Sequence, residues 1–170
     1  RSMLGMPKNQ ALAALISRSS QPASVHLSLS PQQDDVLVVS ANHPLSRADL
    51  DDLDSKRAPR ARLAIELGVE ISRVSPVMIP ATTPCLDCRN LSFANADLAW
   101  ASLASQLRTR KERLDDSQTA LLCAGLSLEK ALRFFDGLSP VPFESNSIDH
   151  RSGMIFSETW DWHSDCGCKT

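Results

Sequence analysis

Two close cysteine pairs are the clearest chemical signal in this chain of 170 residues. Cys85 and Cys88 form a Cys-x-x-Cys motif, and Cys166 and Cys168 form a Cys-x-Cys motif near the C-terminus. Zn²⁺ prefers four thiolate or imidazole ligands in a tetrahedron, and a short cysteine spacing places two thiolates on one ion. The two pairs together predict one structural Zn²⁺ that holds the C-terminus against the middle of the fold.

The shorter second motif leaves the identity of one ligand open. His163 lies three residues before Cys166, so its imidazole could replace one of the four thiolates. In both versions the metal joins a loop at 83–88 to residues 163–168 as a zinc knot.

A redox role for Cys85 and Cys88 is the other interpretation of the first motif. It requires the motif to lie at the N-terminus of a helix that follows a strand, as in thioredoxin-like folds. Pro84 directly before the motif and the presence of a second pair argue against this role. The fifth cysteine, Cys123, lies in an apolar stretch and is expected to be a core residue.

The composition is that of one globular domain over residues 1–170, with 42% hydrophobic and 22% charged residues. The formal net charge of −2 offers no basic surface for nucleic acid, which disfavours a zinc-ribbon nucleic-acid binder. No apolar run approaches the roughly 20 residues that span a bilayer, so no membrane partner is expected. An odd number of cysteines and no recognisable signal peptide favour a reducing, cytoplasmic location.

Alternating strand and helix signals predict an α/β fold. A continuous apolar run at 36–39 is typical of a strand buried on both faces of a parallel sheet. The other expected strands lie at 25–29, 63–71, 77–79, 147–150 and 154–160, and the expected helices at 9–19, 46–56, about 95–113 and from Ser117 onward. We therefore expect an incomplete, mostly parallel Rossmann-like sheet with flanking helices, an antiparallel C-terminal hairpin and the zinc knot.

Glycines and a capping residue set several of these boundaries. Ser46 is a typical N-cap for the helix at 46–56, and Gly68 predicts a bend or bulge in the strand at 63–71. Gly137 is expected to end the last helix. The apolar face of that helix, which we expect to pack into the core, consists of Leu121, Leu122, Leu128, Leu132 and Phe135.

Four polar or aromatic residues are candidates for contacting a partner. Asn42 and His43 follow the strand at 36–39, and ligands of open α/β sheets bind at the carboxyl ends of strands. A solvated loop is the alternative for His43, since no partner acid is evident. Trp160 and Trp162 lie near the second cysteine pair and could form a peptide-docking patch or pack around the metal.

Three segments resemble the second half of ThiF/MoeB/HesA-type proteins, the bacterial relatives of ubiquitin-activating enzymes. They are Thr83-Pro84-Cys85-Leu86-Asp87-Cys88, the helical stretch from Leu122 to Leu132, and the C-terminal cysteine pair. Gly5-Met6-Pro7-Lys8 and Asp35–Val39 are similar to the family's Gly-x-Pro-Lys segment and central strand. The ending Trp160–Cys168 looks most like an actinobacterial branch. Members of that branch are often associated with thiazole/oxazole-modified peptide clusters, as leader-peptide-binding or cyclodehydratase-related proteins.

The resemblance implies the fold of an ATP-dependent adenylyltransferase, but the nucleotide-binding residues of that family are missing. No Gly-x-Gly-x-x-Gly loop precedes the first expected helix, and such a loop brings backbone N–H groups close to phosphate. Ala41-Asn42-His43 stands where the family has an Asp after its central strand, and an amide cannot hold Mg²⁺ as a carboxylate does. We therefore expect a domain that lacks the N-terminal nucleotide-binding unit and does not bind ATP.

Two functions are consistent with this pattern. The first is a non-catalytic, zinc-stabilised ThiF-like scaffold that binds a peptide or protein partner in peptide modification. The alternative is the C-terminal part of an ATP-dependent adenylyltransferase whose nucleotide-binding half is absent from this chain. The resemblance also implies a homodimer, and an incomplete sheet with an unpaired edge favours such pairing.

Overall fold

The computed structural model describes residue 10 and residues 36–54, 61–109, 117–138 and 143–169. The predicted strand at 25–29 and all but residue 10 of the predicted helix at 9–19 lie outside these ranges. The chain divides into two compact units, Arg1–Gln32 and Gln33–Thr170, and every described residue except Gln10 belongs to the second.

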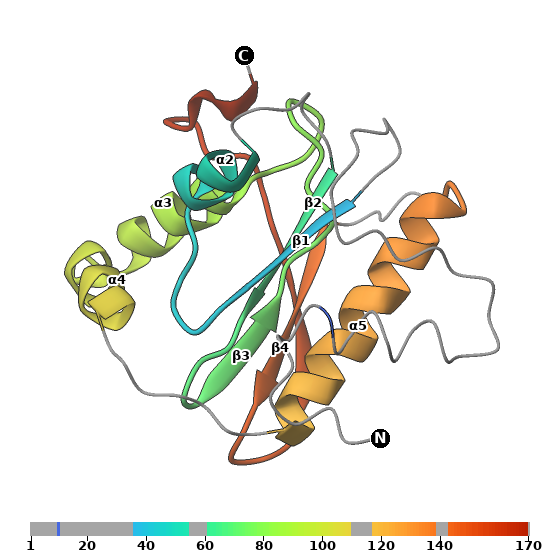
Figure 1. The fold of residues 1–170 in the computed structure, drawn as a ribbon. Helices are drawn as coiled ribbons and strands as arrows, with labels where there is room; N and C mark the ends of the chain where they lie inside the picture. The colour runs from blue at the N-terminus through green and yellow to red at the C-terminus, as the bar shows by residue number, and fades with distance from the viewer. Residues whose placement is uncertain (1–9, 11–35, 55–60, 110–116, 139–142, 170) are drawn as a thin grey trace, which may run out of the picture. The chain divides into compact units, whose positions relative to one another are not determined.

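Within the described ranges, five strands form one open sheet in the order in which they occur along the chain (Figure 1). They are β1 (Val36–Ala41), β2 (Ala61–Glu66), β3 (Ile71–Val74), β4 (Glu144–Asp149) and β5 (Ile155–Thr159). β1 and β2 are parallel, whereas the pairs β2–β3, β3–β4 and β4–β5 are antiparallel. The architecture is therefore mixed α/β, and the prediction of a mostly parallel sheet is wrong for the described residues.

The sheet is less parallel than predicted because the stretch at 63–71 belongs to a hairpin and not to one strand. Its alternation of apolar and polar residues continues through the turn at 67–70, so the period alone does not show the break. Gly68 lies in this turn, where an added Cβ atom would come 2.1 Å from the carbonyl oxygen of Ile71. The predicted bend at Gly68 is a full reversal of the chain, which makes β2 and β3 antiparallel.

The two remaining strand predictions have different outcomes. The segment at 77–79 forms no strand, although Met78 and Arg62 exchange two backbone hydrogen bonds of 2.7 and 2.8 Å. The C-terminal hairpin is confirmed, because β4 and β5 pair on either side of a turn that contains Gly153. The φ angle of Gly153 is +69°, a conformation that favours glycine.

The described helices are α2 (Arg47–Asp54), α3 (Leu86–Ala96), α4 (Trp100–Thr109) and α5 (Ser117–Phe135), and a 3-10 turn follows at Gly167–Lys169. Figure 1 shows α5 on one side of the sheet and α2, α3 and α4 on the other. Each side has its own apolar cluster. Leu63 of β2 shares one cluster with Cys123 of α5, and Ala64 of β2 shares the other with Leu50 and Leu86. None of these helices combines the length and the apolar character needed to cross a bilayer.

Two helix boundaries follow the predicted capping residues. The N–H of Ser46 donates to Asp49 Oδ2 at 2.7 Å, and the N–H of Asp49 donates to Ser46 Oγ at 3.4 Å. This reciprocal pair is a capping box at the start of α2. Gly137 ends α5 with a φ of +67°, and its N–H and that of Leu138 donate to carbonyl groups of the last helical turn.

α5 packs on the sheet through the side opposite to the predicted one. Its buried residues are Thr119, Cys123 and Ser127, so the prediction of Cys123 as a core residue is confirmed. The predicted core face is exposed instead, with exposed fractions of 77% for Leu121, 46% for Leu122, 60% for Leu128, 52% for Leu132 and 54% for Phe135. We call these five residues the α5 outer face. The prediction chose the wrong side because α5 is apolar on both sides: Leu126 and Phe134 pack against the core beside Cys123.

Candidate metal centre and polar cavity

The four paired cysteines come together from distant parts of the chain. Their sulfur atoms all lie within 4.8 Å of one another. The Sγ atoms of Cys85 and Cys166 are 3.6 Å apart, and those of Cys88 and Cys168 are 3.4 Å apart. Four thiolates bound tetrahedrally to Zn²⁺ at about 2.3 Å place their sulfur atoms about 3.8 Å apart. The cluster therefore has the donor set and the dimensions of a four-thiolate site and could hold a metal ion.

Two short elements position these thiols. Cys85 is the N-cap residue of α3 and Cys88 lies in its first turn, while Cys168 lies in the 3-10 turn. The loop predicted at 83–88 therefore ends at Cys85, where α3 begins. A helix N-terminus favours thiolates, as the redox alternative requires, but the 3.4 and 3.6 Å contacts join one pair to the other.

Two of these thiols, those of Cys85 and Cys168, resist ionisation. Burial raises the pKa of Cys85 to about 11, and burial and the neighbouring thiols raise the pKa of Cys168 well above its usual value. Burial also disfavours the Cys88 thiolate, but hydrogen bonds with the backbone of His163 and Cys85 outweigh it and lower the pKa of Cys88. A divalent cation would stabilise all four thiolates together, which is what a buried cluster of this kind requires.

His163 supports the cysteine cluster without joining it. Its Nδ1 accepts a hydrogen bond from the N–H of Asp165 at 3.1 Å, and its Nε2 lies 2.8 Å from the side-chain nitrogen of Asn95. Both ring nitrogens are therefore engaged, and the carbonyl of His163 accepts from the N–H of Cys166. The geometry favours the four-cysteine version of the predicted site.

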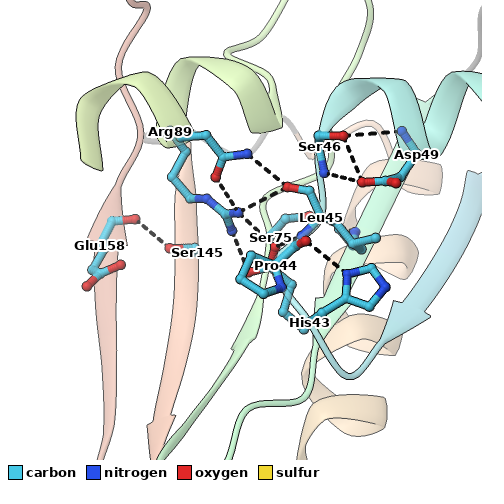
Figure 2. A network of polar contacts seen from close by, with 12 residues as sticks. His43, Pro44, Leu45, Ser46, Asp49, Ser75, Arg89, Ser145 and Glu158 are labelled. Atoms are coloured by element: carbon cyan, nitrogen blue, oxygen red, sulfur yellow. Dashed lines mark hydrogen bonds and ion pairs between the residues drawn. The ribbon is translucent and has the colours of Figure 1, made fainter. Parts of the chain in front are cut away.

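A buried ion pair begins one residue after the first cysteine motif. Arg89 of α3 donates two hydrogen bonds, of 2.6 and 2.7 Å, to the carboxylate of Glu66 at the end of β2. Both side chains are more than nine-tenths buried. The backbone N–H of Leu45 donates to the same carboxylate at 2.6 Å, so the pair fixes the loop that follows β1 (Figure 2).

The sequence does not indicate this ion pair because its charged residues have the pattern of solvent-facing positions. Glu66 occupies the polar phase of β2, which α3 covers in the folded chain. The guanidinium of Arg89 also lies 5.2 Å from the ring of Trp160 and 5.5 Å from that of Phe93. No local signal identifies such long-range partners.

A cavity of about 400 Å³ opens at the carboxyl ends of β1 and β2. Its lining includes Asn42, His43, Glu66, Arg73, Trp100 and Leu107. The structure thus brings Asn42 and His43 together on one cavity, where open α/β sheets bind ligands. The Nδ1 atom of His43 lies 3.0 Å from the carbonyl oxygen of Pro44, which positions the ring (Figure 2).

Arg73 is the cationic residue of this cavity that sequence analysis did not single out. Its Nε atom is buried and has no hydrogen-bond partner among the described residues. Burial lowers the pKa of its guanidinium, against the opposing charges of Glu158 and Glu66. A partly buried guanidinium with an unused donor is suited to bind a carboxylate.

The two candidate tryptophans lie in different environments. Trp160 is only 5% exposed and belongs to the apolar cluster on the α3 side of the sheet. Trp162 is half-buried, and its ring lies 5.3 Å from the ammonium group of Lys169. They do not form one exposed patch, so Trp162 alone is accessible to a partner.

No family model and no curated protein matches the chain, whereas several solved structures do. The E. coli microcin synthetase McbBCD complex superposes with a TM-score of 0.61 and 16% identity, over 84% of this chain and 56% of that chain. E. coli MccB with AMPCPP and MccA gives a TM-score of 0.64 and 17% identity, over 96% and 51%. The microcin C7 biosynthetic enzyme MccB in complex with N-formylated MccA gives 0.56 and 18%, over 80% and 41%.

These superpositions show that the chain has a ThiF-like fold, in agreement with the resemblance found in the sequence. At 16–18% identity they establish the fold alone. The chain spans about half the length of the solved proteins that it matches.

Proposed function

We propose that this chain is a non-catalytic, zinc-stabilised ThiF-like scaffold that binds a peptide or protein partner in peptide modification. The cavity at the carboxyl end of β1 supports this function most directly. Asn42 and His43 can hydrogen-bond to a partner there, but they lack the carboxylate that holds Mg²⁺. The buried carboxylate of the cavity, Glu66, is already paired with Arg89.

The chemistry of the cavity also indicates the kind of partner. Trp100 and Leu107 of α4 supply apolar surface, and Arg73 supplies a guanidinium with an unused donor. Such a site suits an extended peptide that carries a carboxylate. MccB has been solved with the peptide MccA, which supports a peptide partner for a chain of the same fold.

Matched peptides test this function. We expect fluorescein-labelled ten-residue peptides that contain Asp to bind more tightly, by anisotropy, than the same peptides with Asn. Arg73→Gln should weaken the acidic peptides at least tenfold, whereas Arg133→Gln, an exposed arginine of α5, should leave them unchanged. If no acidic peptide binds, or if Arg73→Gln binds as the unchanged protein does, the proposed function is wrong.

Three further features belong to this proposal. The cysteine cluster binds Zn²⁺, and the protein works in the cytoplasm, where thiols stay reduced. Residues 1–170 act as one ThiF-like domain without a nucleotide-binding unit. The scaffold is a homodimer, since the described sheet is open and β1 and β5 are its edges.

The alternative function is the C-terminal part of an ATP-dependent adenylyltransferase. The matched proteins are about twice as long, and one was solved with AMPCPP, which keeps this alternative open. Titration calorimetry with millimolar Mg-ATP separates the two. The scaffold function predicts no heat of binding, and saturable micromolar binding would return the chain to the adenylyltransferases.

A further inference from the structure

We infer that the α5 outer face, Leu121, Leu122, Leu128, Leu132 and Phe135, is a docking surface for a second copy of the same helix in antiparallel orientation. Such docking rests on the homodimer proposed above and names its surface, and it is independent of peptide binding. Among the described residues, the sheet contacts α5 through the opposite side, which carries Thr119, Cys123 and Ser127 together with the partly buried Leu126 and Phe134.

The spacing of the exposed residues identifies the occupant as a helix. Leu121, Gly125, Leu128, Leu132 and Phe135 follow one another at intervals of four, three, four and three residues. This 3.5-residue repeat is the seam of a two-stranded coiled coil, in which each side chain inserts between four residues of a facing helix. A strand or an extended peptide would not match a stripe of this period.

Among the described residues, no contact explains why position 125 of the seam is a glycine. A Cβ atom at this position would meet nothing within 4 Å, and the helix would be more stable with alanine. The missing side chain leaves a hole in the middle of an otherwise leucine-rich stripe. A glycine at such a position is useful when a facing side chain has to approach the helix closely.

The stripe is complementary to itself only in the antiparallel orientation. When the two helices cross between Gly125 and Leu128, Gly125 of one helix lies opposite Leu128 of the other, and Leu121 lies opposite Leu132. A large residue then fills the hole left by glycine. In a parallel pair, Gly125 would face Gly125 and leave a cavity.

The exposed area is adequate for a dimer. The α5 outer face and Leu138, which is 54% exposed, offer six apolar side chains with roughly 600 Å² in total, which reaches the lower bound of about 600 Å² per partner for a stable interface. A patch of this size on a single helix is at the upper end of what monomers expose.

Sedimentation velocity from 1 to 100 µM tests the inference on the full chain. We expect a dimer whose dissociation constant rises at least tenfold in Leu128→Glu. The matched control is Leu98→Glu, because Leu98 is 96% exposed but lies outside α5. A monomer at every concentration, or a Leu128→Glu dimer as tight as the unchanged one, would overturn the inference.

Gly125→Ala gives a second test, and its expected result cannot be explained by misfolding. Alanine should raise the melting temperature of the dilute monomer, because it favours the helix, yet weaken dimerisation at least tenfold. A Gly125→Ala dimer as tight as the unchanged one would overturn the inference even if Leu128→Glu failed to fold. Peptide anisotropy on Leu128→Glu separates the docking surface from the peptide-binding function. If the variant binds peptide as the unchanged protein does but no longer dimerises, the α5 outer face is the dimer surface and peptide binding does not depend on it.

Discussion

Helices α3 and α5 lie on opposite sides of the same sheet and are held in opposite ways. α3 has no apolar stripe, and its buried residues are Leu86, Cys88 and Arg89. α5 has a regular apolar stripe, and the chain leaves that stripe exposed. Helical periodicity therefore identifies α5 but not its packing, and it misses α3 altogether.

The difference shows which interactions anchor a helix when apolar burial does not. α3 is joined to distant segments by the cysteine cluster at its N-terminus and by the Arg89–Glu66 ion pair one turn later. α5 contacts β2 and β3 through small side chains and through the partly buried Leu126 and Phe134. Specific polar groups thus add to the burial of Leu86 in fixing α3, whereas packing on the sheet alone fixes α5.

Among the changes that test this comparison of α3 with α5, loss of the metal should have the largest effect on stability. Because the cysteine pairs are about 80 residues apart, the ion would close a long loop, and Cys85→Ser should lower the melting temperature by more than about 10 °C. Elemental analysis should find one zinc per chain in the unchanged protein and none in the variant. Cys123→Ala, on α5, should keep its zinc. A metal-free protein, or a variant that melts normally, would show that α3 is anchored in another way.

Breaking the buried ion pair should have the next largest effect. Arg89→Met leaves the Glu66 carboxylate buried and unpaired, so the free energy of unfolding in urea should fall by about 3–5 kcal/mol. The double variant Glu66→Leu with Arg89→Met should recover most of this loss, since no charge then stays buried. On α5, Arg133→Met breaks an exposed pair with Glu129 and should cost less than about 0.5 kcal/mol. Equal losses at the two arginines would contradict the comparison.

The same contrast explains how much of the molecule could be predicted from the sequence. Features that depend on local chemistry could be predicted, and the structure contains them. They are the cysteine pairs, the N-cap at Ser46, the helix end at Gly137 and the C-terminal hairpin. The ion pair and the face of α5 depend on segments that meet only in the folded chain. A stripe of leucines has the same pattern whether it packs on its own sheet or on another molecule.

The α2 capping box should have a smaller effect. Asp49 is partly buried, which raises its pKa, but hydrogen bonds from Ser46 and the charge of Arg108 outweigh this and lower the pKa below 3.8. Its carboxylate therefore stabilises the fold above that pH, and the contribution is lost as the pH falls through the lower value of the folded state. Asp49→Asn should cost about 1 kcal/mol in urea at pH 7. The difference in the free energy of unfolding between Asp49→Asn and the unchanged protein should vanish in acid. A difference that stays constant with pH would show that the charge of Asp49 is not involved.

Leu121→Gln should have the smallest effect and gives the most direct test of the α5 assignment. Leu121 is 77% exposed in the structure, so dilute protein should keep its free energy of unfolding within about 0.5 kcal/mol. Leu63→Ala in β2 is the matched core substitution, because Leu63 is fully buried and its loss should cost about 2–5 kcal/mol. If Leu121→Gln were as costly as Leu63→Ala in the monomer, the stripe would be part of the core after all. A leucine that belongs to a regular apolar stripe and yet contributes little to the stability of the monomer is what distinguishes the two sides of this sheet.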